Sequence, residues 1–462
     1  MENIINKKIK KFSNNIFLIT ENKKIKYKNL LSAPEEKLNF VRKGDLILIV
    51  ANNTLSFFEI YFFALKRNAP IMLVDETTNT SNLNKIISLY KPNYIFLPTE
   101  NPQILPKLKR IIYFDFLLIK FSQIKNIINE DLAILLSTSG STGSSKFVKL
   151  SYENIFDNAF NISKYLKINY THTTITTMPP SYSYGLSIIN SHFFQGSKIV
   201  INKSSFFDKD FWKKLNENKV TSFGGVPFHF EILRKLRFNK MNFKHLRYLT
   251  QAGGVLKSED INFFLDSCKI KKIKFIQMYG QTEASPRISY LPFLQAKKKI
   301  GSIGKVIPGG KMFIKTKKNQ KVGEIIYSGK NVFMGYSLNK DDLRKKTRNK
   351  QILKTGDFAW KDDQGYYFLV GRKDSFVKIS GLRVNLNEIK NLLEKQKIFS
   401  EIVKKKEKIV IFTTSSKNQD QITSLIFSEF KLNKGFFKIV KIKKFTRNSR
   451  GKVNLNLVDY ND

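Results

Sequence analysis

The stretch "DLAILLSTSGSTGSSKFVKLSYENIFDNAFNISKYL" (131–166) decides the fold. It opens with a short apolar run, "DLAILLS" (131–137), that is typical of a buried strand. Ser, Thr and Gly fill the segment that ends at Lys146, and Ser151 then caps a predicted helix. The apolar residues of that helix repeat at helical spacing: Ile155, Ala159, Ile162 and Leu166. A strand, a loop and a helix in this order are expected at the carboxyl edge of a parallel sheet, where ligands bind.

Strands and helices also alternate before this stretch. "DLILIVANN" (45–53) predicts a buried strand, and "SFFEIYFFALKRNAPIMLVD" (56–75) predicts a helix, a turn and a strand. Alternating elements of this kind favour a mainly parallel sheet covered on both faces. The fold class expected is therefore α/β, with a large N-terminal domain of layered αβ sheets.

The pattern of predicted elements changes near residue 300. "VGEIIYSGKNVFMGY" (322–336) and "GDFAWKDDQGYYFLVGR" (356–372) predict short strands, the second pair joined by a turn at "DDQG" (362–365). We expect a small β subdomain near 300–370. A Lys-rich α+β segment follows, so the predicted domains are 1–373 and a small mobile C-terminal domain, 374–462.

Length and composition set broad limits. A chain of 462 residues exceeds one ordinary core, and 42% hydrophobic with 13% aromatic residues is a globular composition. The lone Cys268 excludes a disulfide framework and fits a reducing compartment. The apolar run Ile16–Ile19 is too short for a signal-peptide core, and no run approaches the roughly 18 residues of a membrane span. We expect a cytoplasmic protein without a transmembrane segment.

The formal net charge of +44 raises the question of a nucleic-acid partner. Residues 374–462 hold 19 Lys or Arg and 9 Asp or Glu, which is nearly the charge density of the whole chain. A dedicated binding patch should concentrate the charge instead. No nucleic-acid partner is expected.

The Ser/Thr/Gly loop has two interpretations. Its backbone N–H groups and hydroxyls suit phosphate oxygens, and Lys146 adds positive charge. The pattern is not that of a P-loop NTPase, because Lys146 follows Ser145 and precedes Phe147. From these residues alone, a flexible surface linker remains the alternative.

Further motifs follow in a fixed order along the chain. They are "QAGGVL" (251–256), "YGQTE" (279–283), "GSIGKVIPG" (301–309), "GEIIYSGKNVFMGY" (323–336), "TGD" (355–357), "GRKDSFVKISGLRVNLNEI" (371–389) and "NSRGK" (448–452). Together with "STSGSTGSSK" (137–146), this set resembles the adenylate-forming superfamily of acyl- and aryl-CoA synthetases, peptide-synthetase adenylation domains and luciferases. The resemblance covers nearly the whole chain.

The resemblance implies two reactions. A carboxylate attacks the α-phosphate of ATP and expels pyrophosphate; a thiol then attacks the acyl-adenylate and expels AMP. Thr282 would bind the α-phosphate, and Glu283 would hold Mg²⁺. Tyr279 would stack on adenine, Asp357 would accept from the ribose hydroxyls, and Arg372 would reach the ribose–phosphate region. Gly253 and Gly254 would line the adenine edge. The phosphate loop implied is Thr138, Ser139, Gly140, Ser141, Thr142, Gly143 and Lys146.

The small C-terminal domain would carry the remaining roles. Lys452 would bridge the substrate carboxylate and the α-phosphate during adenylation. Asp374 matches the hinge about which this domain rotates. Rotation would remove Lys452 and bring Lys378 and Gly381 to the acceptor tunnel. The acceptor implied is CoA, and the alternative is the pantetheine of an acidic acyl carrier protein, for which a basic surface is suited.

The acid is less well determined by the sequence. Candidates for the acid pocket are Tyr182, Tyr184, Gly185, Phe228 and Gln277, with ordinary core packing as the alternative for each. The segment 179–187 lacks the Asp with which amino-acid-activating relatives meet an ammonium group, and this favours an acid without an α-amine. The Phe- and Tyr-rich walls favour an apolar acyl or aryl group. Departures from the family pattern are Ser145, Leu386 and Thr446 in place of Pro, Tyr182 in place of a common His, and a short C-terminal part.

Overall fold

The computed structural model describes residues 4–100, 110–123, 127–137, 146–316, 319–345, 351–379, 382–405, 408–415, 417, 419–430, 432, 434–447 and 453. The chain divides into two units. Unit 1 comprises Met1–Met312 and Tyr327–Leu353, and unit 2 comprises Phe313–Ile326 and Lys354–Asp462.

The first sheet of unit 1 is parallel at its centre and antiparallel at its edges. Within the unit its strands follow the order β16-β15-β14-β13-β12-β10-β11-β1-β2. The strands from β14 to β1 run parallel, whereas β2, β15 and β16 pair antiparallel. Their bounds are β1 (Ile16–Ile19), β2 (Lys24–Lys26), β10 (Thr173–Ile175), β11 (Lys198–Val200), β12 (Ser222–Gly225), β13 (Tyr248–Gln251), β14 (Lys274–Gly280), β15 (Arg287–Leu291) and β16 (Ser302–Val306).

The second sheet of unit 1 follows the order β19-β9-β8-β4-β3-β5-β7-β6. Its central strands β8, β4, β3 and β5 run parallel. Their residues are buried almost throughout, as expected for strands covered on both faces. The bounds are β3 (Ile47–Ala51), β4 (Ile71–Asp75), β5 (Tyr94–Pro98), β6 (Arg110–Tyr113), β7 (Phe116–Lys120), β8 (Leu132–Ser137), β9 (Phe147–Ser151) and β19 (Gly335–Ser337).

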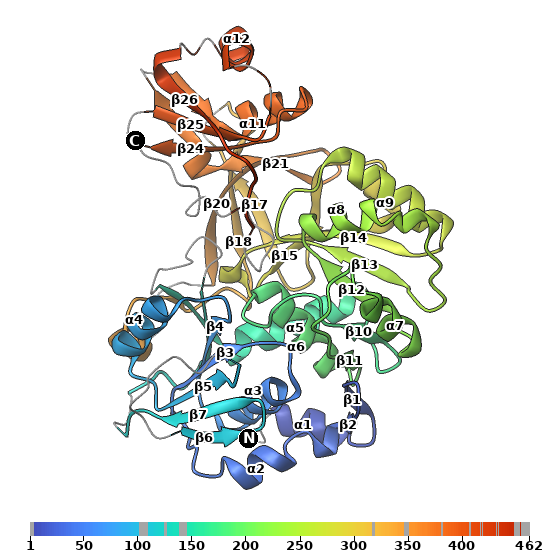
Figure 1. The fold of residues 1–462 in the computed structure, drawn as a ribbon, viewed down its shortest axis with the longest axis vertical. Helices are drawn as coiled ribbons and strands as arrows, with labels where there is room; N and C mark the ends of the chain where they lie inside the picture. The colour runs from blue at the N-terminus through green and yellow to red at the C-terminus, as the bar shows by residue number, and fades with distance from the viewer. Residues whose placement is uncertain are drawn as a thin grey trace. The chain divides into compact units, whose positions relative to one another are not determined.

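Helices cover both sheets (Figure 1). α3 (Leu55–Arg67), α5 (Tyr152–Leu166) and α6 (Ser183–Phe194) share one apolar core with strands of both sheets. α4 (Thr80–Tyr90) packs on the second sheet through Leu83 and Tyr90. The other helices of unit 1 are α1 (Ile4–Lys11), α2 (Ser32–Lys37), α7 (Lys209–Glu217), α8 (Pro227–Lys235), α9 (Ser258–Ile270) and α10 (Phe293–Ala296), with short 3₁₀ turns η1 (Tyr27–Asn29), η2 (Phe238–Lys240), η3 (Thr282–Ala284) and η4 (Lys340–Arg344).

The α/β class is confirmed, and the stretch that decides the fold forms most of its predicted elements. β8 is the predicted strand, and the Ser151 side chain accepts a hydrogen bond from the Asn154 backbone at the start of α5. The sequence did not predict β9, which pairs antiparallel with β8 and precedes α5. The Ser/Thr/Gly loop therefore joins two antiparallel strands, and its residues 138–145 lie outside the described residues.

Unit 2 has a core of its own, which includes Val384, Ile389, Ile411 and Ile426. Its first strands follow the order β17-β18-β20-β21, and the predicted turn at 362–365 joins the last two. By contacts, 313–326 and 354–373 belong with the C-terminal residues; movement of 374–462 as a separate domain stays a prediction. The elements are β17 (Lys311–Lys315), β18 (Gly323–Ser328), β20 (Ile352–Lys361), β21 (Tyr367–Arg372), η5 (Lys373–Ser375), β22 (Phe376–Ile379), β23 (Leu382–Asn385), α11 (Leu386–Lys395), β24 (Ser400–Lys405), β25 (Lys408–Thr413), α12 (Gln419–Phe430), η6 (Lys434–Phe436) and β26 (Phe437–Lys441).

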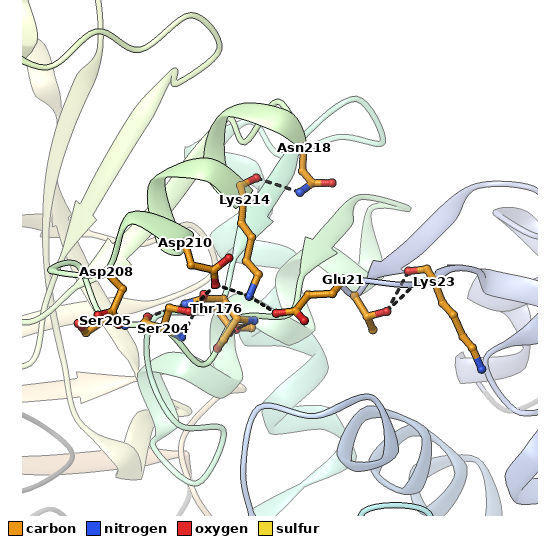
Figure 2. A network of polar contacts seen from close by, with 11 residues as sticks. Glu21, Lys23, Thr176, Ser204, Ser205, Asp208, Asp210, Lys214 and Asn218 are labelled. Atoms are coloured by element: carbon orange, nitrogen blue, oxygen red, sulfur yellow. Dashed lines mark hydrogen bonds and ion pairs between the residues drawn. The ribbon is translucent and has the colours of Figure 1, made fainter.

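A polar network ties the β1–β2 hairpin to α7 (Figure 2). The Lys214 ammonium lies 2.7 Å from Glu21 Oε1 and 2.6 Å from Asp210 Oδ2. Asp210 also accepts a hydrogen bond of 2.6 Å from the Ser204 hydroxyl. Glu21, Asp210 and Lys214 border an open, mixed-charge cavity of about 640 Å³. Because one ammonium bridges a carboxylate of the hairpin and a carboxylate of α7, the network is suited to hold the hairpin in place.

Among the described residues, no helix combines the length and the apolar character needed to cross a membrane.

Glu59 on α3 predicts a pH-dependent stability. Burial, together with the charge of Asp115, raises the pKa of Glu59 from 4.5 to about 7. The folded chain therefore holds this proton more tightly than the unfolded chain, and stability falls as the pH rises from about 4.5 through about 7. The shift corresponds to a loss on the order of 3 kcal/mol. We expect the melting temperature of Glu59→Gln to vary less between these pH values than that of the wild type; parallel curves would contradict this.

Candidate active site

The "YGQTE" motif lies at the end of β14 and in the turn that follows it. Thr282 is buried in η3, and its hydroxyl lies 3.1 Å from Ser183 Oγ at the start of α6. Gly280 has no room for a side chain, since a Cβ there would lie 1.7 Å from the carbonyl oxygen of Pro286. The close return of the chain at Pro286 thus requires glycine, and the turn presents Thr282 against α6.

Asn331 holds this turn in place. Its side-chain amide donates to the backbone oxygens of Ala284 (2.6 Å) and Arg287 (2.8 Å). Its side-chain oxygen accepts from the Tyr327 hydroxyl at 2.7 Å, and its backbone oxygen accepts from Ser285 at 2.8 Å. A buried, fully bonded amide of this kind fixes the chain on either side of it. The role of Asn331 was not predicted from the sequence, although an Asn inside an apolar strand-and-turn segment was a signal.

Glu283 and Lys146 meet at a common neighbour, Tyr336. The Tyr336 hydroxyl donates to Glu283 Oε1 at 2.9 Å, and the Lys146 ammonium lies 3.5 Å from the centre of the Tyr336 ring. A cation over an aromatic face is attracted by the ring quadrupole. Two predicted residues that are far apart in sequence thus lie together. Tyr336, on β19, is the last residue of the motif at 323–336, and its role was not predicted from the sequence. The other predicted loop residues, Thr138 to Gly143, lie outside the described residues.

The site fits a magnesium ion that is held largely by substrate. The described residues contain no group of three or more acidic, His or Cys side chains that could hold a metal. Mg²⁺ commonly takes one or two protein carboxylates and completes its shell with phosphate oxygens and water. Glu283, half-buried at the surface of the turn, matches that donor set.

Gly253 and Gly254 form a tight turn after β13. The buried side chain of Gln251 donates to the Gly254 backbone oxygen at 2.9 Å. Gly253 has a φ of +83°, and a Cβ there would lie 2.4 Å from the Tyr182 hydroxyl. The turn therefore packs directly against the predicted acid pocket. Gln251 is the first residue of the motif at 251–256, and its role was not predicted from the sequence.

The predicted acid-pocket residues divide between two faces. Tyr182 and Tyr184 join Val226, Ile276 and Met278 in one buried apolar cluster, with Phe228 packed against it. Gly185 is in the first turn of α6, where a Cβ would lie 2.7 Å from the Pro179 carbonyl oxygen. Gln277 alternates with Ile276 and Met278 on β14 and so shares the face of Tyr279.

Unit 2 brings two predicted residues together. Asp357 on β20 faces Arg372 on β21 across the antiparallel pair, and Arg372 Nε lies 3.3 Å from Asp357 Oδ1. Asp374 is in η5, and Lys378 is on β22; their side chains are not among those described. Gly381 and Lys452 lie outside the described residues, although the neighbours Arg447 and Val453 form an antiparallel bridge.

Removal of the Tyr336 hydroxyl tests its link to Glu283. Tyr336→Phe keeps the ring beneath Lys146 but deletes the hydrogen bond to the carboxylate. We expect the Mg²⁺ concentration for half-maximal ATP–pyrophosphate exchange to rise about 10-fold. Tyr170→Phe, at an exposed tyrosine, is the matched control. An unchanged Mg²⁺ dependence in Tyr336→Phe would show that the contact does not orient Glu283.

Comparison with known proteins gives a family match. The sequence model of the AMP-binding enzymes matches residues 37–337. A 2-succinylbenzoate–CoA ligase of Oceanobacillus iheyensis is 26% identical over 349 residues, which cover 75% of this chain and 68% of the ligase. A probable 4-coumarate–CoA ligase of Dictyostelium discoideum is 25% identical over 402 residues, covering 77% of this chain and 72% of that protein.

Solved structures show the same fold. The O-succinylbenzoate coenzyme A synthetase of Bacillus subtilis in complex with AMP superposes with a TM-score of 0.80 at 19% identity, covering 100% of this chain and 98% of that one. ATP-bound MatB of Rhodopseudomonas palustris gives a TM-score of 0.77 at 18% identity, covering 99% and 98% of the two chains.

Proposed function

Because the chain belongs to the AMP-binding enzyme family, we propose that it is an ATP-dependent acid–CoA ligase that forms AMP. The observation that carries this proposal is the meeting of Lys146 and Glu283 at Tyr336. A cation for the leaving phosphates and a carboxylate for magnesium are the two charges that adenylation requires at one place. CoA ligases among the relatives support the same reaction class.

In the first step a carboxylate oxygen of the acid attacks the α-phosphorus, and the bond to pyrophosphate breaks. Lys146, with the loop 138–143, neutralises the leaving phosphates. Thr282, fixed by Ser183, would donate to the α-phosphate, and Glu283 would hold the Mg²⁺ that accompanies ATP. Bound Mg²⁺ supplies charge neutralisation on the phosphates. Tyr279, Gly253, Gly254, Asp357 and Arg372 are proposed to hold the adenosine.

In the second step a thiol sulfur attacks the acyl carbonyl carbon, the bond to AMP breaks, and the thiol proton is released. We propose that residues 374–462 rotate about Asp374 between the steps, so that Lys378 and Gly381 meet the acceptor. CoA is the favoured acceptor because the relatives named above are CoA ligases. An acidic acyl carrier protein is the alternative that the net charge of +44 favours. We also propose a cytoplasmic location, in keeping with the buried, unpaired Cys268.

The experiment is ATP–pyrophosphate exchange over a panel of acids: short-chain, long-chain, aryl, dicarboxylic and amino acids. Acid-dependent exchange with one class establishes adenylation and names that class. Thioester formation is then measured with CoA and with a pantetheinylated carrier protein. Absence of exchange with every class, in a chain that also fails to bind ATP, would reject the proposal.

A further inference from the structure

A buried arginine lies beside the proposed acid pocket. Arg287, on β15, is 2% exposed and is among the largest fully buried side chains. Its Nη2 donates to Ser187 Oγ at 3.1 Å, and its guanidinium carbon lies 4.8 Å from the centre of the Tyr184 ring. Its Nε has no hydrogen-bond partner. No carboxylate of the described residues forms an ion pair with it, so its charge is buried against neutral groups.

Such a cation is costly to bury. Removing a guanidinium from water without a counter-ion costs several kcal/mol, and buried charges are normally paired or hydrogen-bonded throughout. The neutral hydroxyls of Ser187 and Tyr165 and the aromatic face of Tyr184 compensate only part of this cost. The arrangement is therefore suited to an anion that arrives with a ligand.

Three further polar side chains border the same cavity as Arg287 with atoms that form no well-aligned hydrogen bond. They are His192 through Nε2, Ser222 through Oγ and Tyr248 through its hydroxyl, and the last two hydroxyls face one another. These four side chains come from α6 and from three strands of one sheet, β12, β13 and β15, of which β13 and β15 are separated by β14. Buried polar atoms without partners are uncommon, and several around one cavity indicate water or a polar ligand group there.

The donors outnumber the acceptors at this cavity. His192 Nδ1 lies 2.8 Å from the Ile188 backbone oxygen, so Nδ1 carries the proton of the neutral imidazole. Burial lowers the pKa of His192 to about 4, so the ring is neutral at pH 7. Its Nε2 is therefore an acceptor at neutral pH. Arg287, Tyr248 and Ser222 each offer a donor. A carboxylate at the arginine, with a water molecule that donates to His192, would satisfy this set.

Helix α6 connects the cavity to the reacting groups. Ser183, at its start, contacts Thr282, and Ser187, one turn later, contacts Arg287. Four residues of helix span about 6 Å. Tyr184 lies between them and belongs to the same apolar cluster as Tyr182. An acid whose reacting carboxylate lies near Thr282 thus reaches the arginine only if it is short and extended.

We propose, resting on the function proposed above, that Arg287 binds a second carboxylate of the substrate, so that the activated acid is a short dicarboxylic acid. The cavity has a volume of about 10 Å³, which suits a single water-sized group. Entry of a carboxylate therefore requires a lining side chain to move. Met278 is unbranched and is the lining residue best able to do so.

The test compares matched acids in ATP–pyrophosphate exchange: succinate with butanoate, glutarate with pentanoate, and adipate with hexanoate. We expect the wild type to prefer one dicarboxylic acid over its partner by about 100-fold in kcat/KM. Arg287→Met should lower kcat/KM for that dicarboxylic acid about 100-fold, mainly through KM, and lower it far less for the monocarboxylic acid. Arg287→Lys should restore part of the preference. Arg42→Met, at an exposed arginine, is the control.

A second pair of variants keeps the inference testable if Arg287→Met does not fold. Tyr248→Phe and Ser222→Ala retain the arginine and remove only cavity donors, and each should weaken use of the dicarboxylic acid about 10-fold. Equal effects on both acids of a pair would identify a structural water site and overturn the inference. Exchange in the wild type with monocarboxylic acids alone would overturn it while leaving the proposed function intact. No exchange with any acid would reject both.

Discussion

Lys452→Ala is expected to lower acid-dependent ATP–pyrophosphate exchange by about 10²–10³-fold. The family resemblance implies that this lysine bridges the substrate carboxylate and the α-phosphate in the first step, where negative charge accumulates as the two anions approach. A fixed cation offsets that charge in the transition state more than in the ground state. The proposed rotation of residues 374–462 removes the lysine before the second step, so thioester formation from a supplied acyl-adenylate and CoA should remain close to the wild-type rate.

Another lysine of the C-terminal segment 374–462 provides the control for this prediction. Lys444 is exposed and lies near the same end of the chain, and Lys444→Ala removes an equal charge. It should leave both steps unchanged. If the two variants slow exchange equally, the loss reflects the overall positive charge of residues 374–462 and not a specific role of Lys452. If Lys452→Ala slows both half-reactions equally, the proposed rotation is wrong.

Glu283→Gln is expected to lower exchange about 10²-fold at saturating ATP and Mg²⁺. The substitution preserves the shape of the side chain and an oxygen that can accept from Tyr336, but removes the negative charge proposed to hold magnesium. Because Glu283 accepts the Tyr336 hydrogen bond at the surface of the turn, its loss should leave the melting temperature nearly unchanged. At saturating Mg²⁺, the loss of exchange activity should be larger in Glu283→Gln than in Tyr336→Phe, because Tyr336→Phe leaves the carboxylate in place.

An exposed glutamate on α9 is the matched control for the charge. The Glu259 side chain is 82% exposed, and Glu259→Gln should exchange pyrophosphate at the wild-type rate. Retention of full activity in Glu283→Gln would show that the carboxylate does not bind the metal. A large fall in melting temperature would show instead that the residue stabilises the turn.

Local sequence signals predicted many individual elements well. Ser151 and the helical repeat after it predicted α5, because a capping side chain and an amphipathic period act within the element itself. The apolar run 131–137 predicted β8 for the same reason. β9 was missed because "FVKLS" is short and buries even Lys149, whose ammonium donates to the backbone oxygen of Asp342, so no alternating pattern marks it.

The candidate site was predicted in part. Its motif residues were recognised because their order along the chain resembles a family. Their partners were not assigned roles, because Tyr336, Asn331 and Ser183 lie far in sequence from the residues they position. Arg287 was missed as well: four residues after Glu283, an arginine in the sequence gives no sign of whether it is exposed or buried.

By itself, the sequence determined the fold class, the family and the order of the site motifs. Periodicity, capping and short glycine turns depend only on residues that are close together in the sequence. The tertiary structure decided which of these residues meet: Lys146 with Glu283 at one tyrosine, Asp357 with Arg372 across two strands, and a buried arginine without a carboxylate partner among the described residues. The reason is physical. Burial and pairing depend on residues brought together by packing, and a charge acquires its role from what surrounds it.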